Sequence, residues 1–588
     1  MLGKKSDQLG MLEADHLYLE HVGRCSFYGF LASMRGRLFR DEDFVELYCP
    51  DNGRNSVPPS LLATALLLQT HDKVSDEEAK ERADFDIRWK VALGIGVDER
   101  PFAKSTLQLF RAHLIIHDKA RAVFQRSIRF ARETGHLKGR RMKAALDTTY
   151  ILGRGAVKDT YNLLADGIAQ VARALARLEG VKAEVWAREH GFERYFGSSV
   201  KGGAGVDWDK EKSRRAFLQG IVADADRMLE MAREYQAGEA EGSVRRQDII
   251  KAAELLGQLL LQDVERKEDG EDIKEGVSRD RIVSVHDPEM RHGRKSSSRR
   301  FEGHKGAIVV DGDSQVITAV GVLPGNAPDN RGALELVEQS EENTGMEVEE
   351  TIGDCAYGDG GTRQAFADAE RVLIAKVPGR PNKAYYPKED FVIDLESGSC
   401  TCPAGVTTEV QRGLQSRADG EGGRERVRGF VFDASVCGAC ELRTMCVASK
   451  KGKGRTVSLH PQEGLLQQAR ALQHSEAFAQ YCILRQAAEH RLARLAGQLG
   501  VRQARYRGRA KTLFQITIAA AVANLTLVAT KVGLMGKAKG SDILFCAAIY
   551  RAFLVIAATI LALTLSLAKT LSVAWPTHKL HPAEGVLG

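Results

Sequence analysis

The apolar positions in the first part of the chain follow a helical pattern. The prolines in Val57-Pro-Pro-Ser60 mark a helix start, because proline is tolerated in a first helical turn, and the apolar run Leu61 to Leu68 follows. Ser75-Asp-Glu-Glu78 has the form of a capping box that opens another helix, and Ser105 is placed to cap the next. We therefore expect a helical N-terminal domain over residues 1–140. Such a domain suits either DNA-end binding or a scaffold for dimerisation, and no helix-turn-helix stands out in it.

The pattern changes at Lys143 to Leu152, an apolar run without Gly or Pro that predicts a β-strand. From about Tyr161 to Gly276 the chain is rich in Ala, Glu, Arg and Leu, which predicts a long helical insertion. Gly202-Gly-Ala-Gly205 lies inside this insertion. Because no strand precedes it, we expect a loop between helices and not a nucleotide-binding turn.

After the insertion, two β-branched runs predict a hairpin. They are His304 to Val310 and Gln315 to Leu323, separated by Asp311-Gly-Asp-Ser314. Further periodic segments then predict, in order, helix 331–339, strand 347–352, helix 362–370 and strand 371–377. This order describes an α/β fold with a mixed sheet.

Length and charge limit the possibilities only loosely. A chain of 588 residues is too long for one ordinary core, so two or three units are expected. A net charge of +6 is compatible with a polyanionic partner without requiring one. No stretch at the N-terminus has the basic, apolar and small-residue order of a secretion signal. We therefore expect a cytoplasmic protein whose ten cysteines are thiols.

Three carboxylates, Asp147, Asp354 and Glu489, stand in local contexts that suit metal ligands. Asp147 falls within the first predicted strand, and Asp354 falls just beyond a later one, where open α/β sheets place their ligands. Magnesium prefers oxygen ligands, and two ions about 4 Å apart can activate an attacking water or 3′-hydroxyl. We expect the three acids to hold two Mg²⁺ or Mn²⁺ ions for phosphodiester chemistry on DNA. Any one of them alone is more typically a surface charge or a helix cap.

The surroundings of these acids resemble the motif blocks of bacterial insertion-sequence DDE transposases, over roughly residues 30–530. The matching stretches are Leu146-Asp-Thr-Thr-Tyr150 with Asp159-Thr-Tyr-Asn-Leu163, Gly303-His-Lys-Gly306, Val322-Leu-Pro-Gly-Asn326 with Asp329, Gly353-Asp-Cys-Ala-Tyr-Gly358, Tyr481 to Glu489, Arg505 to Lys511, and Ala523-Asn-Leu525. The resemblance implies an RNase H-like catalytic domain over residues 141–535, interrupted by the helical insertion 161–276. It also implies that Asp147, Asp354 and Glu489 are the catalytic, metal-binding triad.

The last motif block departs from the family in one respect. Tyr481, Arg485 and Glu489 lie four apart and share one helix face. Arg485 either holds Glu489 in an ordinary salt bridge or contacts a phosphate near the cleavage site. The lysine that the family carries further on is replaced by Ala496, and Arg491 or Arg494 is a candidate substitute.

Basic residues are concentrated in two stretches. One runs from Arg291 to Arg300, and the other belongs to a segment, His490 to Ser541, that contains no acidic residue. Neutralisation of phosphates by such residues gives strong, salt-sensitive affinity for DNA. Together with the motif block, these stretches predict DNA contacts by Arg291, Arg294, Lys295, Arg299, Arg300, Lys305, Tyr481, Arg485, Arg491, Arg494, Arg505, Arg507, Arg509 and Lys511.

A Cys-rich insertion is expected over residues 385–455. It contains Cys400-Thr-Cys402, Cys437-Gly-Ala-Cys440 and Cys446. A CxxC pair with two further thiols fits tetrahedral Zn²⁺, with Cys402, Cys437, Cys440 and Cys446 as ligands and Cys400 as a candidate replacement for Cys402. The wide separation of Cys402 from Cys437 is loose for a zinc ribbon, so metal-free thiols are the alternative.

Residues 536–588 form an apolar tail that is not part of the family pattern. The run from Ala552 to Ala568 is uncharged and at the short limit for a bilayer span. A buried or oligomer-forming helix, a membrane anchor and an irregular extension of the reading frame are all compatible with it.

The functional hypothesis is a DNA transposase that acts on the bacterial nucleoid. It would bind double-stranded DNA at the inverted-repeat ends of its mobile element and join them to target DNA. The need to hold two ends favours a homodimer or larger assembly. The rival hypotheses are a related metal-dependent nuclease, a DNA-binding protein whose catalysis has decayed, and a membrane-associated protein defined by its tail.

Overall fold

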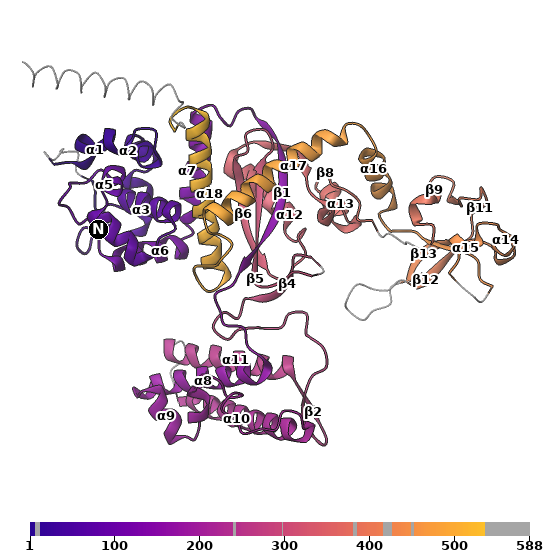
Figure 1. Ribbon diagram of the computed structural model, residues 1–588, viewed down its shortest axis with the longest axis horizontal. Coiled ribbons are helices and arrows are strands. Elements are labelled where there is room, and N and C mark those ends of the chain that lie inside the picture. Colours follow the sequence, from indigo (N-terminus) through magenta and orange to yellow (C-terminus); the bar gives the residue numbers. More distant parts are fainter. Residues whose placement is uncertain are drawn as a thin grey trace, which may run out of the picture.

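A computed structural model gives the arrangement of the chain (Figure 1). The structure describes residues 1–5, 12–238, 243–296, 298–379, 385–415, 426–448 and 452–535. The apolar tail 536–588 lies outside the described residues, so the predictions for it stay predictions.

The N-terminal region is helical, as expected. Helix α3 begins at Pro59, and the Ser75 side chain caps α4 by accepting the backbone N–H of Glu78. The prediction for Ser105 is wrong, because α6 already begins at Lys104 and Ser105 lies inside its first turn. The elements are α1 (Ala14–Val22), α2 (Phe27–Leu38), η1 (Asp41–Leu47), α3 (Pro59–Asp72), α4 (Asp76–Phe85), α5 (Ile87–Leu93), α6 (Lys104–Ile116) and α7 (Ala120–Glu133).

A six-stranded mixed sheet forms the centre of the molecule. Its strands are β1 (Arg141–Leu152), β4 (Arg291–Arg294), β5 (Arg300–Asp311), β6 (Ile317–Pro324), β7 (Glu347–Ile352) and β8 (Val372–Ile374). The order is β4-β5-β1-β7-β8, and β6 also pairs with β5. The predicted hairpin is therefore present as β5 and β6. Strand β5 pairs antiparallel with β1, whereas β7 and β8 continue the sheet on the other side of β1 in parallel. Helices α12 (Ala333–Thr344) and α13 (Gly360–Asp368) connect the later strands. This mixed sheet is consistent with an RNase H-like core.

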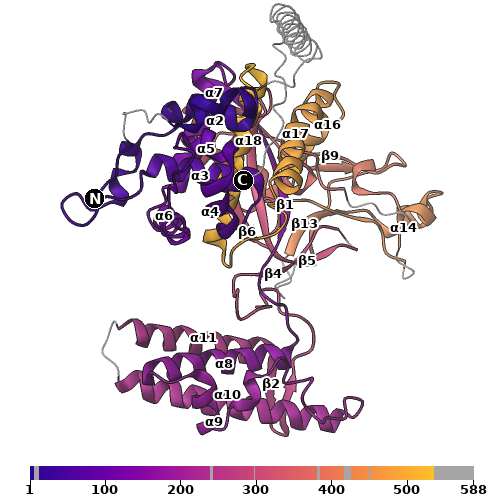
Figure 2. The ribbon, with the colours of Figure 1, turned by 60° about the vertical axis from the view of Figure 1, so that its left-hand side comes forward.

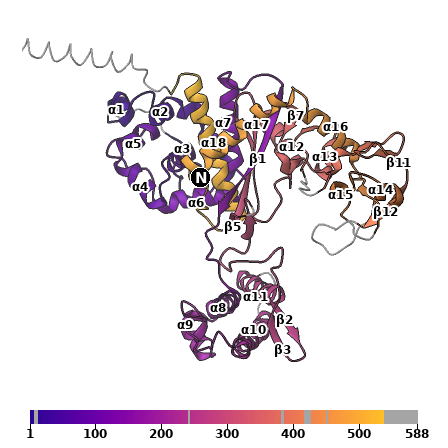
Figure 3. The ribbon, with the colours of Figure 1, turned by 45° about the vertical axis from the view of Figure 1, so that its right-hand side comes forward.

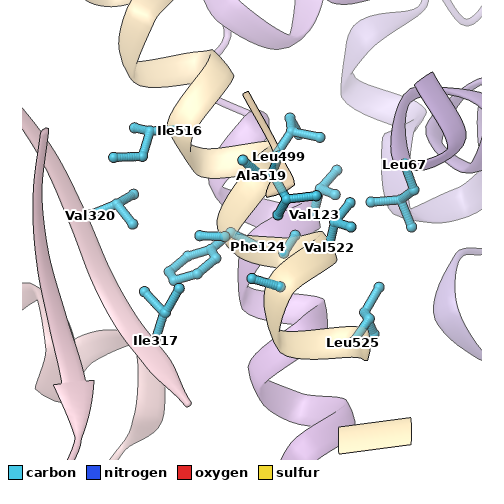
Figure 4. Close-up of a cluster of buried hydrophobic side chains, with 14 of the residues drawn as sticks. Leu67, Val123, Phe124, Ile317, Val320, Leu499, Ile516, Ala519, Val522 and Leu525 are labelled. Carbon is cyan, nitrogen blue, oxygen red and sulfur yellow. The ribbon is translucent and has the colours of Figure 1, made fainter. Parts of the chain in front are cut away.

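Two late helices complete this core. Helix α17 (Phe478–Ala493) continues through the π-helical turn η5 (Arg494–Gln498), and α18 (Arg509–Lys531) follows. Figure 4 shows α18 side chains meeting those of α3, α7 and β6 in one apolar cluster. Within the part of the chain that the structure describes, α18 is the one helix long and apolar enough to cross a membrane, but 89% of its most apolar window is buried inside the protein. That burial makes α18 a core helix.

The insertion forms a separate body with its own apolar core (Figures 1 and 2). It contains α8 (Thr160–Glu179), α9 (Ala183–Glu189), η2 (Glu193–Phe196), α10 (Glu211–Gly238) and α11 (Val244–Asp263). Gly202 to Gly205 lies between helices, as expected. The helical prediction fails at its end, where β2 (Val264–Lys267) and β3 (Gly270–Ile273) form a hairpin. The chain turns there at Gly270, whose φ of +122° is open to glycine.

The Cys-rich region lies on the side of the sheet away from the N-terminal helices (Figures 1 and 3). It has two small three-stranded sheets, β11-β10-β9 and β12-β13-β14. Their bounds are β9 (Val392–Asp394), β10 (Ser399–Thr401), β11 (Thr407–Thr408), β12 (Gln411–Gln415), β13 (Arg426–Val431) and β14 (Thr456–Ser458), preceded by η4 (Lys388–Asp390). Short helices α14 (Ala434–Gly438) and α15 (Arg443–Cys446) join them, and α16 (Glu463–Gln473) leads back to α17.

Candidate active site

Asp147 lies in the middle of β1, with its side chain largely buried. One carboxylate oxygen accepts the backbone N–H of Thr148 at 2.7 Å. Burial, followed by the nearby charge of Asp354, raises the pKa of Asp147 to about 6, although Thr148, Lys295 and Arg485 oppose the shift. The ionised form of Asp147 therefore lacks sufficient positive charge around it, and a bound divalent cation would supply that charge.

Asp354 lies two residues after the end of β7 (Glu347–Ile352) and caps the short helix η3 (Cys355–Tyr357). Its Oδ1 accepts the backbone N–H of Ala356 at 2.8 Å. The parallel pairing of β1 with β7 sets Ala145 opposite Ile352. Two residues further along each strand come Asp147 and Asp354, so this register places the two carboxylates side by side at one edge of the sheet.

Two residues next to these acids were not among the predicted site residues. Tyr357 is 2% exposed, and burial together with the charges of Asp147, Asp329 and Asp354 holds the pKa of its phenol well above the usual range. Gly353 makes room for it, because a Cβ there would lie 2.8 Å from the Tyr357 ring. Tyr357 and Asp329 both fall within the motif blocks, and that was the signal by which they could have been found.

The third acid, Glu489, forms a salt bridge with Arg485 on helix α17. Helix α17 packs across β1, and Arg485 Nη1 lies 2.6 Å from Glu489 Oε1. The salt bridge that was one of two alternatives for Arg485 is therefore present, and the Arg485 charge also lowers the pKa of Asp147. Arg485 thus stands between the Asp147 end of the site and Glu489. Tyr481, on the same helix face, donates its hydroxyl to Glu350 at 2.7 Å.

The donor set suits Mg²⁺ or Mn²⁺, because it consists of carboxylate oxygens around an acid with a raised pKa. Within the described ranges, no three His, Cys, Asp or Glu side chains are grouped to hold an ion as they stand. The structure brings Asp147 and Asp354 together, and Arg485, whose charge acts on Asp147, is paired with Glu489.

Exposed basic side chains surround this edge of the sheet. Arg294, Lys295, Arg299 and Arg300 lie around the β4–β5 turn, and Lys295 is near enough to affect the pKa of Asp147. Arg299 and Arg502 lie over the Tyr150 ring, with the guanidinium carbons 5.2 and 3.9 Å from its centre. Arg507, Arg509 and Lys511 are exposed before and at the start of α18, with Arg509 also paired to Glu289 at 2.9 Å.

Two predicted DNA contacts are not on the surface. Lys305 is held by Asp329 at 2.6 Å and by the carbonyl of Ala327 at 2.7 Å. Arg491 is 5% exposed, because it lies two residues from Glu489 and so faces the opposite side of α17.

Three further arginines of the predicted set have side-chain partners within the protein. Arg494 donates to Gln498 and Thr526, Arg291 donates to the carbonyls of Pro288 and Met290, and Arg505 donates to the carbonyl of Val74. Arg491 is thus buried and Arg494 is hydrogen-bonded within the protein, and a role of either in place of the missing lysine stays a prediction.

Comparison with protein families identifies two regions of the chain. Residues 401–529 match the model described as Transposase DDE domain, and residues 26–113 match the Transposase domain (DUF772). The first match runs from the Cys-rich region through Glu489 to α18, and the second covers α2 through most of α6. Searches of curated proteins and of solved structures gave no match. The chain therefore carries a DDE transposase domain in its later part and a DUF772 transposase domain among its N-terminal helices.

Proposed function

We propose that this transposase binds the ends of its own mobile element, cleaves a strand there and joins the liberated 3′-hydroxyl to target DNA. The observation that carries the proposal is the side-by-side placement of Asp147 and Asp354 at one sheet edge, with the pKa of Asp147 raised to about 6. A DDE domain requires divalent cations for catalysis, and two neighbouring carboxylates can bind such a cation.

Asp147, Asp354 and Glu489 would hold two Mg²⁺ or Mn²⁺ ions. Bound there, the ions supply an activated water or 3′-hydroxyl and stabilise the leaving oxygen of the phosphodiester. A cation bound there would lower the pKa that burial raises and so hold Asp147 in its ionised form. The salt bridge between Arg485 and Glu489 would then have to break, and Arg485 would be able to pair with a phosphate of the bound strand.

The DNA would lie along the exposed basic side chains at this edge. The β4–β5 turn contributes Arg294, Lys295, Arg299 and Arg300, and the segment before α18 contributes Arg507. Lys295 is close enough to Asp147 to act on its pKa, so a phosphate backbone held by this turn would pass the acidic pair. Contacts of this kind position a duplex without reading its sequence. Recognition of two element ends then requires two protomers or more in the active assembly, working on the bacterial nucleoid.

The test is incubation of the purified protein with Mg²⁺ and labelled element ends. Joined products support transposition, cleavage without joining supports a nuclease, and binding without cleavage supports a protein whose catalysis has decayed. Asp354→Ala should abolish cleavage while retaining DNA binding. Asp313→Asn is the matched control, because Asp313 is an exposed acid in the β5–β6 turn. Full cleavage by Asp354→Ala would refute the site.

A further inference from the structure

Four of the five cysteines in the Cys-rich region line one hollow of the surface. They are Cys402, Cys437, Cys440 and Cys446. They come from separate segments: the turn after β10, helix α14, the residue pair that follows it, and the end of α15. The fifth cysteine, Cys400, does not line the hollow, because it is fully buried in the small core that β10 covers. Cys400 therefore lies in the core beside the hollow and not on its wall.

Main-chain hydrogen bonds fix the position of each of these segments. Cys402 begins a tight turn in which its carbonyl accepts the N–H of Gly405 at 2.8 Å and its N–H donates to Val406 at 2.9 Å. Gly405 has a φ of +78°, a conformation that favours glycine. On the other side of the hollow, the carbonyl of Cys440 accepts the N–H of Arg443 at 3.1 Å. The four thiols are thus carried on turns and short helices and not on the strands.

Arg455 ties the same segments together. Its backbone N–H donates to Cys437 Sγ at 3.5 Å. Its guanidinium donates to the carbonyls of Cys446 and Tyr386 at 2.7 and 2.8 Å and lies over the Phe391 ring. A half-buried cation next to the thiols would offset part of the negative charge that four thiolates around a metal ion would bring.

The region has little else to hold it together. Among the described residues its buried core consists of Phe391, Ile393, Cys400, Phe430, Phe432, Cys446 and Val457. Its helices α14 and α15 have five and four residues, too short to be stable by themselves. A unit with so small a core needs a disulfide or a metal ion for stability. The four thiols are free cysteines in the structure, so a metal ion is the remaining means.

We propose that Cys402, Cys437, Cys440 and Cys446 bind one structural Zn²⁺ ion. Four thiolates with no open position form a closed tetrahedral site, which is structural and not catalytic. In the described part of the chain the thiols do not yet close on a common centre. A Zn–S distance of about 2.3 Å requires sulfurs roughly 3.8 Å apart, and side-chain rotation into the hollow that they already line brings them together.

Metal analysis of the full chain, purified without an affinity tag and dialysed against a weak chelator, tests the proposal. We expect one equivalent of zinc per chain. Cys402→Ser and Cys440→Ser should each lose it, and Cys400→Ser is the matched control that should keep it. Replacement of zinc by Co²⁺ should give the intense visible absorption of a tetrahedral thiolate site.

Two results would overturn the proposal: a wild-type chain that retains no zinc after growth with the metal, or loss of zinc in Cys400→Ser equal to that in Cys440→Ser. If the serine variants do not fold, X-ray absorption of the wild-type chain decides. Four sulfur ligands support the site, and fewer than four refute the ligand set. Neither outcome depends on cleavage of DNA, so this proposal can fail while the proposed function stands.

Discussion

Replacement of Asp147 by Asn should stabilise the fold while abolishing cleavage. Burial raises the pKa of Asp147 to about 6 from the value of 3.8 typical of a free side chain. A folded-state pKa above the unfolded one means that ionisation of Asp147 favours unfolding. Stability is therefore lost as pH rises from about 4 through 6, and the cost is complete above pH 6.

The size of the effect follows from the two pKa values. A shift of about 2.2 pKa units corresponds to about 3 kcal/mol at pH 8, about 1.6 kcal/mol at pH 5 and about 0.6 kcal/mol at pH 4. Asn has no charge to bury, so its free energy of unfolding should exceed that of the wild type by an amount that grows with pH in this way. Any difference in stability between an amide and a neutral carboxyl is independent of pH, so it shifts the free-energy difference by the same amount at every pH.

The assay is urea denaturation of both proteins from pH 5 to pH 8, in EDTA and again in Mg²⁺. The wild type should recover stability in Mg²⁺, whereas Asp147→Asn should not, because its amide is a poor ligand for the ion. Asp313→Asn, in the exposed β5–β6 turn, should show no pH-dependent difference. A difference between Asp147→Asn and wild type that is flat across this pH range would refute the burial of an ionised carboxylate in β1.

Three further changes test other parts of the structure. Asn524→Leu should lower the free energy of unfolding by about 2 to 4 kcal/mol in urea denaturation, because the Asn524 amide satisfies both backbone groups of Ile317 in the buried core; an unchanged midpoint would contradict this. Hydrogen bonds from His71, Trp89 and Tyr28 outweigh the effect of burial and lower the pKa of Asp72 to about 2. The ionised Asp72 therefore stabilises the fold fully above pH 4, and this stabilisation is lost as pH falls towards 2. Asp72→Asn should therefore lower the free energy of unfolding by about 2 kcal/mol at neutral pH and by progressively less in acid. A difference from wild type that does not change with pH would show that the charge of Asp72 is not the source of this stability. Gly353→Ala should slow cleavage more than it lowers the melting temperature, because the added Cβ meets the Tyr357 ring at the site; unchanged cleavage rates would count against it.

The sequence predicted those features that depend on neighbouring residues. The strand ending at Ile352 was predicted with its observed bounds, because an alternating apolar run is followed directly by Gly353 and Asp354. The hairpin of β5 and β6 could be predicted equally well, since a polar turn separates two β-branched runs. Local patterns of this kind are therefore sufficient to assign Asp147 to a strand and Asp354 to the end of another.

Features that depend on distant contacts do not follow from local patterns. The pairing of Lys305 with Asp329 depends on how the segment after β6 folds back over β5. Arg491 belongs to a basic stretch by sequence, and its burial follows from which face of α17 meets the core. The end of the insertion was predicted as helix because β2 and β3 are polar and too short to show an alternating pattern.

The position of α18 has a consequence for synthesis of the enzyme. This helix joins the N-terminal helices to β6, yet it is made after all three acids of the site. A polypeptide that stops before residue 509 contains Asp147, Asp354 and Glu489 but leaves the apolar faces of α3, α7 and β6 uncovered. The exposed apolar faces of such a product are recognised by proteases and chaperones, and its central sheet lacks the packing of α18. Incomplete translation should therefore yield a chain that is degraded and not a folded enzyme.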